Sequence, residues 1–92
     1  MIAYIDDRSS SAIKIWVAPY KSDADLCVFV AKYKSDAKGK DGVWFFEKNK
    51  SSSTVTIKQV KYKTDAHLKI YYVNYKSEAG WRKSHPLRGR LG

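Results

Sequence analysis

One pentapeptide recurs along the chain, and this repeat limits the possible folds more than any other feature. Residues 33–37 read Tyr-Lys-Ser-Asp-Ala, and there are six close or weakened copies within 92 residues. The copies begin at Arg8, Tyr20, Tyr33, Asn49, Tyr62 and Tyr75. The recurring interval is 13 residues, and the longest interval contains the segment 38–42 with its two glycines. A short fixed period indicates one small supersecondary unit that has been copied and stacked.

Short apolar runs lie between the copies. They are rich in Val, Ile, Tyr, Phe and Trp, and several alternate apolar with polar residues, which is typical of strands. None is as long as an average helix of about 11 residues. The runs cover residues 2–5, 13–17, 26–30, 43–46, 55–58 and 68–73. The chain is therefore predicted to be mostly β, with about six short strands.

Two aligned columns of apolar residues predict the buried face of these strands, because alternate residues point to the same side of a sheet. The first column holds Ile13, Leu26, Val55 and Leu68, and the second holds Ile15, Val28, Trp44, Ile57 and Ile70. A further column is mostly aromatic and includes Trp16 and Phe29. We expect this column to be partly covered by the connections, by another layer or by Trp81.

The connections between the runs are too long for two-residue hairpin loops. A hydroxyl residue followed by Asp and Ala is typical of a helix start, where the hydroxyl caps a free amide and the acid faces the helix dipole. We therefore interpret each pentapeptide as a joint: an inward tyrosine ring, a single helical turn and a small alanine docked on the strands. From these residues alone, both hairpins and crossovers over a face of the sheet stay open.

Charge and composition divide the chain into residues 1–81, predicted to form a single compact repeat domain, and residues 82–92, predicted to be a basic, flexible tail. The net charge is +9, and the tail has four cations and no acid. Cys27 has no second cysteine to pair with, and no apolar run reaches the ~18 residues of a membrane span. We expect a cytoplasmic protein that does not enter the membrane.

Residues suited to catalysis or metal binding do not form a recognisable pattern. His67 and His85 are distant in sequence, and with Cys27 and scattered acids they match no metal-ligand spacing. The acids and serines recur with the repeat, which favours structural roles. Gly39 and Gly42 match neither phosphate-binding fingerprint. We therefore expect no enzymatic activity and no cofactor.

Residues from about 13 to 81 resemble a family of small bacterial proteins catalogued as a domain of unknown function. The resemblance rests on strand-like runs separated by Tyr/Ser-acid-Ala connections, ending in Ala79-Gly80-Trp81 and a basic tail. It implies a monomer whose short strands wind into a torus-type knot with seven crossings, joined by crossovers of 13-residue period. It implies no activity, substrate or catalytic residue. This chain departs from the pattern at Lys34, Lys50 and Lys63, where its relatives carry more acid.

The remaining candidate site is a basic surface. Cations beside aromatic rings are the arrangement that binds single-stranded nucleic acid, and an acidic protein is another suitable partner. The candidate contacts are Lys21, Lys34, Lys50, Lys63, Lys76, Arg82, Lys83, Arg88 and Arg90. If the connections stack on one side, the lysines form a ladder. We favour a stable, non-enzymatic structural or protein-interaction module; the alternative is a weak, largely non-specific nucleic-acid binder.

Overall fold

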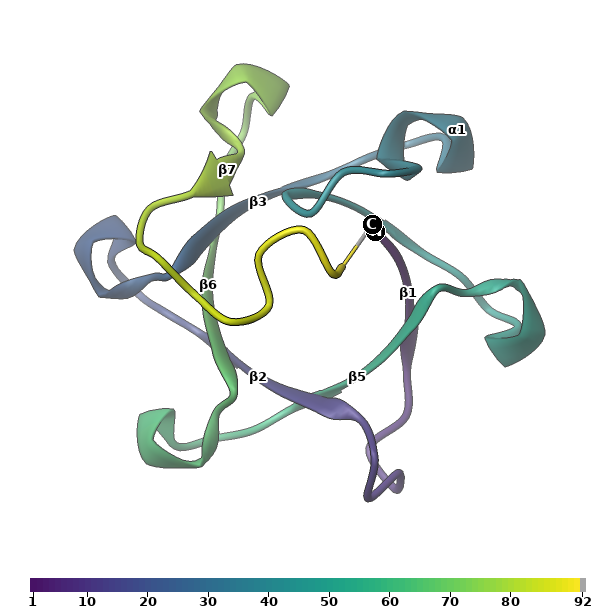
Figure 1. Ribbon diagram of the computed structural model, residues 1–92, viewed down its shortest axis with the longest axis horizontal. Helices are drawn as coiled ribbons and strands as arrows, with labels where there is room; N and C mark the ends of the chain where they lie inside the picture. Colours follow the sequence, from purple (N-terminus) through teal and green to yellow (C-terminus); the bar gives the residue numbers. More distant parts are fainter. Residues whose placement is uncertain (92) are drawn as a thin grey trace.

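The computed structural model describes residues 1–91, and these form seven strands around a common axis (Figure 1). The prediction of a mostly β chain with about six short strands is confirmed. The seventh strand has only two residues and was not predicted, because it does not coincide with an apolar run. The strands are β1 (Ile2–Ile5), β2 (Ile13–Val17), β3 (Leu26–Val30), β4 (Val43–Phe46), β5 (Val55–Gln59), β6 (Leu68–Tyr72) and β7 (Gly80–Trp81).

Six of the strands close into a parallel ring in the order β4-β1-β5-β2-β6-β3, with β3 pairing back to β4. β7 pairs antiparallel with the first half of β3, through Leu26 and Cys27, while β4 pairs with its second half. Parallel neighbours cannot be joined by tight hairpins. The connections are therefore crossovers, which decides between the two alternatives that the sequence left open.

Strands that follow one another in the chain mostly lie two places apart in the ring. β5 lies between β1 and β2, and β6 lies between β2 and β3. The chain therefore passes around the axis a second time and fills the gaps left by its first pass, so that early and late strands alternate in Figure 1. Ile13 pairs with Ile57 rather than with its repeat equivalent Val55, so the strands are also staggered.

The two apolar columns fill the inside of the ring, as predicted. Trp44 and Ile70 are fully buried, and Ile13 and Val55 are half-buried and pack against the same core. The aromatic column is half-covered, with Trp16 and Phe29 both of intermediate exposure. Closure of the ring gives each of its six strands a paired neighbour on both sides and so removes most exposed sheet edges.

Five of the six connections between consecutive strands contain one helical turn, as predicted, whereas the first, residues 6–12, contains only turns and bends. The turns are η1 (Lys21–Asp23), α1 (Lys34–Ala37), η2 (Lys50–Ser52), η3 (Lys63–Asp65) and η4 (Lys76–Glu78). The predicted hydroxyl cap is wrong: in none of these turns does a side chain cap the start. The residue in front of the turn occupies the cap position, and its carbonyl accepts the amide, as from Asp23 N to Tyr20 O at 3.1 Å.

The predicted inward packing of the repeat tyrosines is also wrong. Tyr20, Tyr33, Tyr62 and Tyr75 are 66–69% exposed. Each has extended backbone angles at the outer corner of a connection, and the connections project outward like spokes (Figure 1). The small residue at the end of the pentapeptide makes the inward contact instead, because Ala24 and Ala37 are fully buried.

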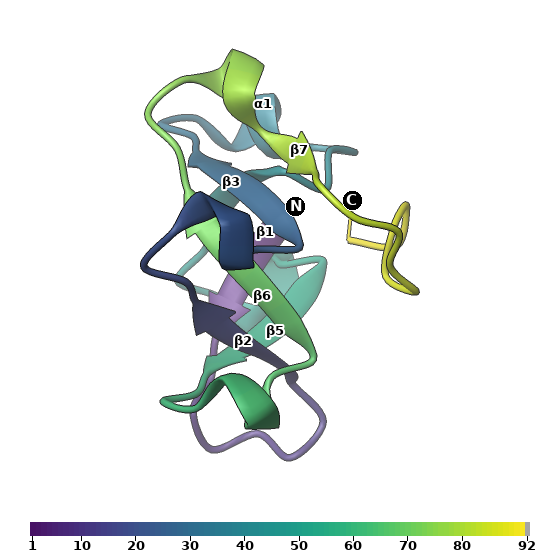
Figure 2. The same ribbon diagram turned by 90° about the vertical axis from the view of Figure 1, so that its left-hand side faces the viewer.

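Residues 82–91, which we call the C-terminal cap, cross one face of the ring (Figures 1 and 2). The sequence predicts a flexible tail, whereas the structure gives this segment a packed position made of turns. Leu91 is buried in the core and Leu87 packs against it. The other expectation for this region, that Trp81 packs on the body, is confirmed, since Trp81 is half-buried against the same core. No helix among residues 1–91 has the length and apolar character of a membrane span.

Candidate functional site

The five repeat lysines do not form a ladder. Each begins the helical turn of a different connection, and the connections are spread around the rim of the ring (Figure 1). The molecule measures 32 × 31 × 21 Å, so these corners point away from one another on a disc. The rim lysines are Lys21, Lys34, Lys50, Lys63 and Lys76. A single extended ligand therefore cannot follow all five along one straight face.

Two of the rim lysines have nearby partners. Lys34 Nζ lies 3.0 Å from Glu47 Oε2, and its hydrogen bond holds the pKa of Glu47 below the ordinary value. Lys63 Nζ lies 5.8 Å from the centre of the Trp16 ring and 3.9 Å from Asp23 Oδ1. The turn η3 thus covers part of the aromatic column. These lysines have structural contacts in addition to any binding role.

Asp41 attaches the C-terminal cap to the ring. Its Oδ2 accepts a hydrogen bond from Trp81 Nε1 at 2.8 Å and another from the Gly89 amide. Its Oδ1 accepts from the Leu91 amide at 3.1 Å. Our sequence reasoning missed this residue. The available signal was its position in segment 38–42, the one insertion in a regular period.

The amino group of Met1 lies in the same region, enclosed by backbone. It donates to the carbonyls of Ala37, Lys40 and Val43 at 2.5, 2.6 and 2.7 Å. Burial lowers the pKa of this amine to about 6, and the Asp41 carboxylate opposes that effect. The start of the chain, the insertion and the C-terminal cap are thereby joined at one end of the ring.

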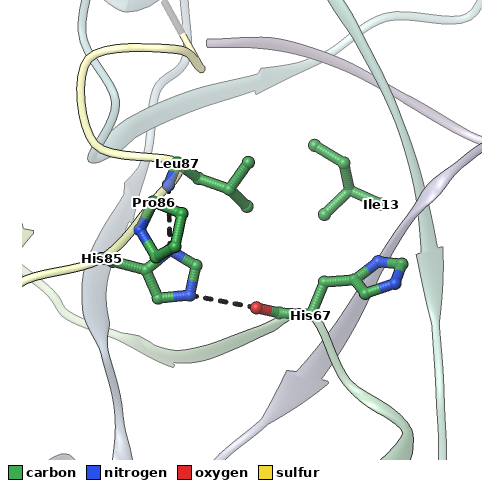
Figure 3. Close-up of a pocket in the computed structure, with 5 residues that line it drawn as sticks. All are labelled: Ile13, His67, His85, Pro86 and Leu87. Carbon is green, nitrogen blue, oxygen red and sulfur yellow. Dashed lines mark hydrogen bonds between the residues drawn. The ribbon is translucent and has the colours of Figure 1, made fainter.

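A cavity of about 440 Å³ lies between the C-terminal cap and the ring, lined by Ile13, His67, His85, Pro86 and Leu87 (Figure 3). His85 Nε2 lies 3.0 Å from the carbonyl oxygen of His67, and His67 Nδ1 accepts the Lys14 amide at 3.0 Å. His67 is exposed, as expected. The sequence did not predict the cavity, because one histidine follows a connection and the other lies in the cap.

The cations of the C-terminal cap lie on the same segment as one wall of this cavity. Arg82, Lys83, Arg88 and Arg90 are all exposed. His85 stacks on Trp81, with 5.3 Å between ring centres and 22° between planes. The acid closest to His85 is Asp25, whose Oδ2 lies 3.8 Å from Nε2. Among residues 1–91, no three histidine, cysteine or acidic side chains gather as a metal site would require.

A family model described as the 7(1) septoil knot domain matches residues 3–82. The comparisons with curated proteins and with solved structures found no match. The family's name denotes a knot of seven crossings, and a chain that passes twice around one axis has the winding of a two-strand torus knot. The match covers nearly the whole chain and every strand of the ring. This protein therefore belongs to the septoil knot family, as its resemblance implied.

Proposed function

We propose that this protein is a non-enzymatic interaction module that binds a partner protein through the corners of its rim. The observation that carries the proposal is the exposure of the four repeat tyrosines, each at 66–69%. A tyrosine offers a large, rigid and amphipathic contact surface, and such rings dominate the binding energy of many protein interfaces. Their placement on a closed ring means that little ordering cost opposes binding.

The charges of the corners favour a protein over a polyanion at these positions. Four of the five turns contain both a lysine and an acid two residues later, as in Lys21 with Asp23 and Lys76 with Glu78. Within these four turns the two charges offset each other, although flanking lysines such as Lys32 and Lys61 leave a small positive excess at two corners. A partner therefore gains chiefly from burying the ring, and the charges set its orientation.

A distinct observation favours a second candidate, weak and largely non-specific binding of nucleic acid at the C-terminal cap. The cap has four exposed cations and no acid, in a chain of net charge +9. The closest carboxylates, Asp25 and Asp41, already accept backbone amides. Lysine and arginine contacts to phosphates release counterions and make the affinity depend steeply on salt.

Two measurements test the candidates. Labelled single-stranded RNA and duplex DNA are titrated at two salt concentrations. A log–log slope of about 0.7 to 0.9 per phosphate contact supports the second candidate, and no binding at low salt ends it. For the first, a photo-crosslinker placed next to Tyr62 is used to capture partners from the native host. A second variant has all four repeat tyrosines changed to serine. If a specific crosslinked protein is lost in this variant, the result supports partner binding through the rim. Equal capture by that variant and the wild type contradicts it.

A further inference from the structure

We propose that the cavity beneath the C-terminal cap is a nucleotide site, in which the base lies against His85 and the cap cations hold the phosphate. The site is distinct from the rim. It deepens the second candidate function and rests on that candidate only in treating the cap as a phosphate-binding surface. The cavity volume of about 440 Å³ lies within the usual range of small-molecule sites, about 300–1,000 Å³.

The walls of the cavity suit a flat, weakly polar group. Ile13 comes from the start of β2, whereas Pro86 and Leu87 come from the cap (Figure 3). Leu87 packs on the core behind it, so this wall is held in place. Apolar side chains on two sides, each with a histidine beside it, match a heteroaromatic ring better than a sugar or a free anion.

The stack between Trp81 and His85 provides a platform for the base. Trp81 covers one face of the imidazole at 5.3 Å between centres, and the imidazole itself lines the cavity. A base placed against His85 extends this stack by one ring. Stacking of a base on an aromatic side chain contributes about 1–3 kcal/mol and accepts any base.

The hydrogen bonds of the two histidines indicate that the site recognises a base by stacking rather than by hydrogen bonds to the edge of the base. His85 Nδ1 accepts the Leu87 amide at 3.1 Å, so its Nε2–H donates to the His67 carbonyl. His67 Nδ1 accepts the Lys14 amide. With these atoms committed to the backbone, the site is expected to prefer the larger purines over pyrimidines and to separate adenine from guanine only weakly.

Cations flank the platform on both sides along the chain. Arg82 and Lys83 precede His85 by at most three residues, and Arg88 follows it by three. All three are exposed. Asp25 lies near the Nε2 edge of His85 and opposes anion binding there. A phosphate is therefore expected on the solvent side of the cap, away from that edge.

The test is an NMR titration of the 92-residue chain with AMP, adenosine, ribose 5-phosphate and an oligoadenylate. AMP is expected to shift the signals of Ile13, His67, His85 and Leu87. Removing the base is expected to weaken binding by about 5- to 150-fold, the range that stacking on an aromatic side chain provides. Removing the phosphate is expected to weaken it through the loss of its contacts with the cap cations. If ribose 5-phosphate binds as well as AMP, or AMP shifts other residues only, the proposal is overturned. Tighter binding of the oligoadenylate than of AMP identifies a nucleic-acid strand as the source of the base, and equal binding identifies a free nucleotide.

Two variants separate this site from the general charge of the cap. His85→Ala is expected to lower AMP affinity, and the Gly89 and Leu91 amide signals report whether the cap stays docked. Arg88→Gln keeps the backbone contacts of the cap and is expected to weaken AMP binding but not adenosine binding. Lys50→Gln, at an exposed rim lysine, is the matched control. If both His85→Ala with a docked cap and Arg88→Gln bind AMP like the wild type, the nucleotide site is excluded. Salt-dependent RNA binding that persists in His85→Ala would then leave the second candidate function standing without it.

Discussion

The carboxylate of Asp41 accepts a hydrogen bond from the indole of Trp81, with 2.8 Å between Oδ2 and Nε1. This contact joins the one insertion in the repeat to the last strand. The same carboxylate accepts two amides of the C-terminal cap, from Gly89 and Leu91. One side chain thus attaches the end of the chain to its middle, and the cavity exists because the cap is held in that position.

Replacing Asp41 is expected to loosen the cap before it unfolds the ring. Asp41→Ala removes the acceptor from three donors, and the hydrogen bonds from the Trp81 indole and the Leu91 amide are part-buried. Unfolding in urea is expected to show a loss of about 2–3 kcal/mol, since hydrogen bonds to a charged group contribute about 1.5–3 kcal/mol each and water replaces part of them. Hydrogen exchange at Gly89 and Leu91 is expected to accelerate more than exchange in β2 or β6. Asp7→Ala, at an exposed site, is the control, and equal effects of the two substitutions would contradict the role of Asp41.

Gly42 is expected to tolerate no side chain, because two other segments approach it closely. A Cβ there would lie 2.9 Å from the Gly80 amide nitrogen and 3.1 Å from the Cys27 carbonyl oxygen. All of these contacts are with backbone, at the point where β7 and the entry to β4 meet along β3. Gly42→Ala is expected to cost roughly 1–3 kcal/mol, the usual range for overpacking, in thermal or urea unfolding.

Gly39 provides the comparison for Gly42 within the same insertion. A Cβ at Gly39 meets open space, but its φ of +72° is left-handed. Gly39→Ala is therefore expected to cost only the backbone strain, about 1–2 kcal/mol. If Gly39→Ala loses more stability than Gly42→Ala, the close approach of β7 is not the main reason for a glycine at position 42.

The two faces of the strands are expected to respond very differently to truncation. Ile57→Ala and Ile70→Ala remove buried side chains from the core of the ring and are expected to cost about 2–5 kcal/mol. Lys14→Ala and Lys69→Ala change half-exposed side chains on the other face and are expected to stay within about 0.5 kcal/mol. Urea unfolding of the four variants checks this, and equal losses would show that the assignment of faces is wrong.

The strands and the core could be predicted from the sequence because the pattern that encodes them is local and written several times. Ile15, Ile57 and Ile70 occupy one column of the repeat, and each meets the same kind of neighbour inside the ring. Where one copy of the repeat has diverged, the other copies still show which positions are apolar. The single helical turn and the buried alanines followed from the pentapeptide for the same reason.

What could not be predicted depends on contacts that occur once, over long separations. The order of strands in the ring, with Ile13 opposite Ile57, follows from winding that no local pattern records. The cavity brings His85 to His67, and the cap is attached by Asp41, and none of these residues belongs to the pentapeptide. The prediction that Tyr62 packs inward was wrong because an extended residue before a turn can point toward the ring or toward solvent. Only the path of the crossover decides between the two.

The amino group of Met1 is expected to make the stability of the 92-residue chain depend on pH. Its pKa is lowered to about 6 in the fold from an ordinary 8.0, with burial as the larger cause. Between these pH values the unfolded chain keeps a proton that the folded chain has released, so the free energy of unfolding rises with pH from about 6 to 8. At 1.36 kcal/mol per pKa unit the rise is at most about 2–3 kcal/mol. Urea unfolding at several pH values measures it.

An N-terminally acetylated chain isolates the contribution of the Met1 amino group, because the acetylated and free chains share every other residue. The acetyl amide has one N–H for the three carbonyls of Ala37, Lys40 and Val43, so the acetylated chain is expected to be less stable. It also has no amine to titrate, and the stability difference between the two forms is expected to widen from pH 6 to 8. A difference that narrows over this range would show the opposite balance, in which the three carbonyls and Asp41 retain the proton more strongly than burial expels it.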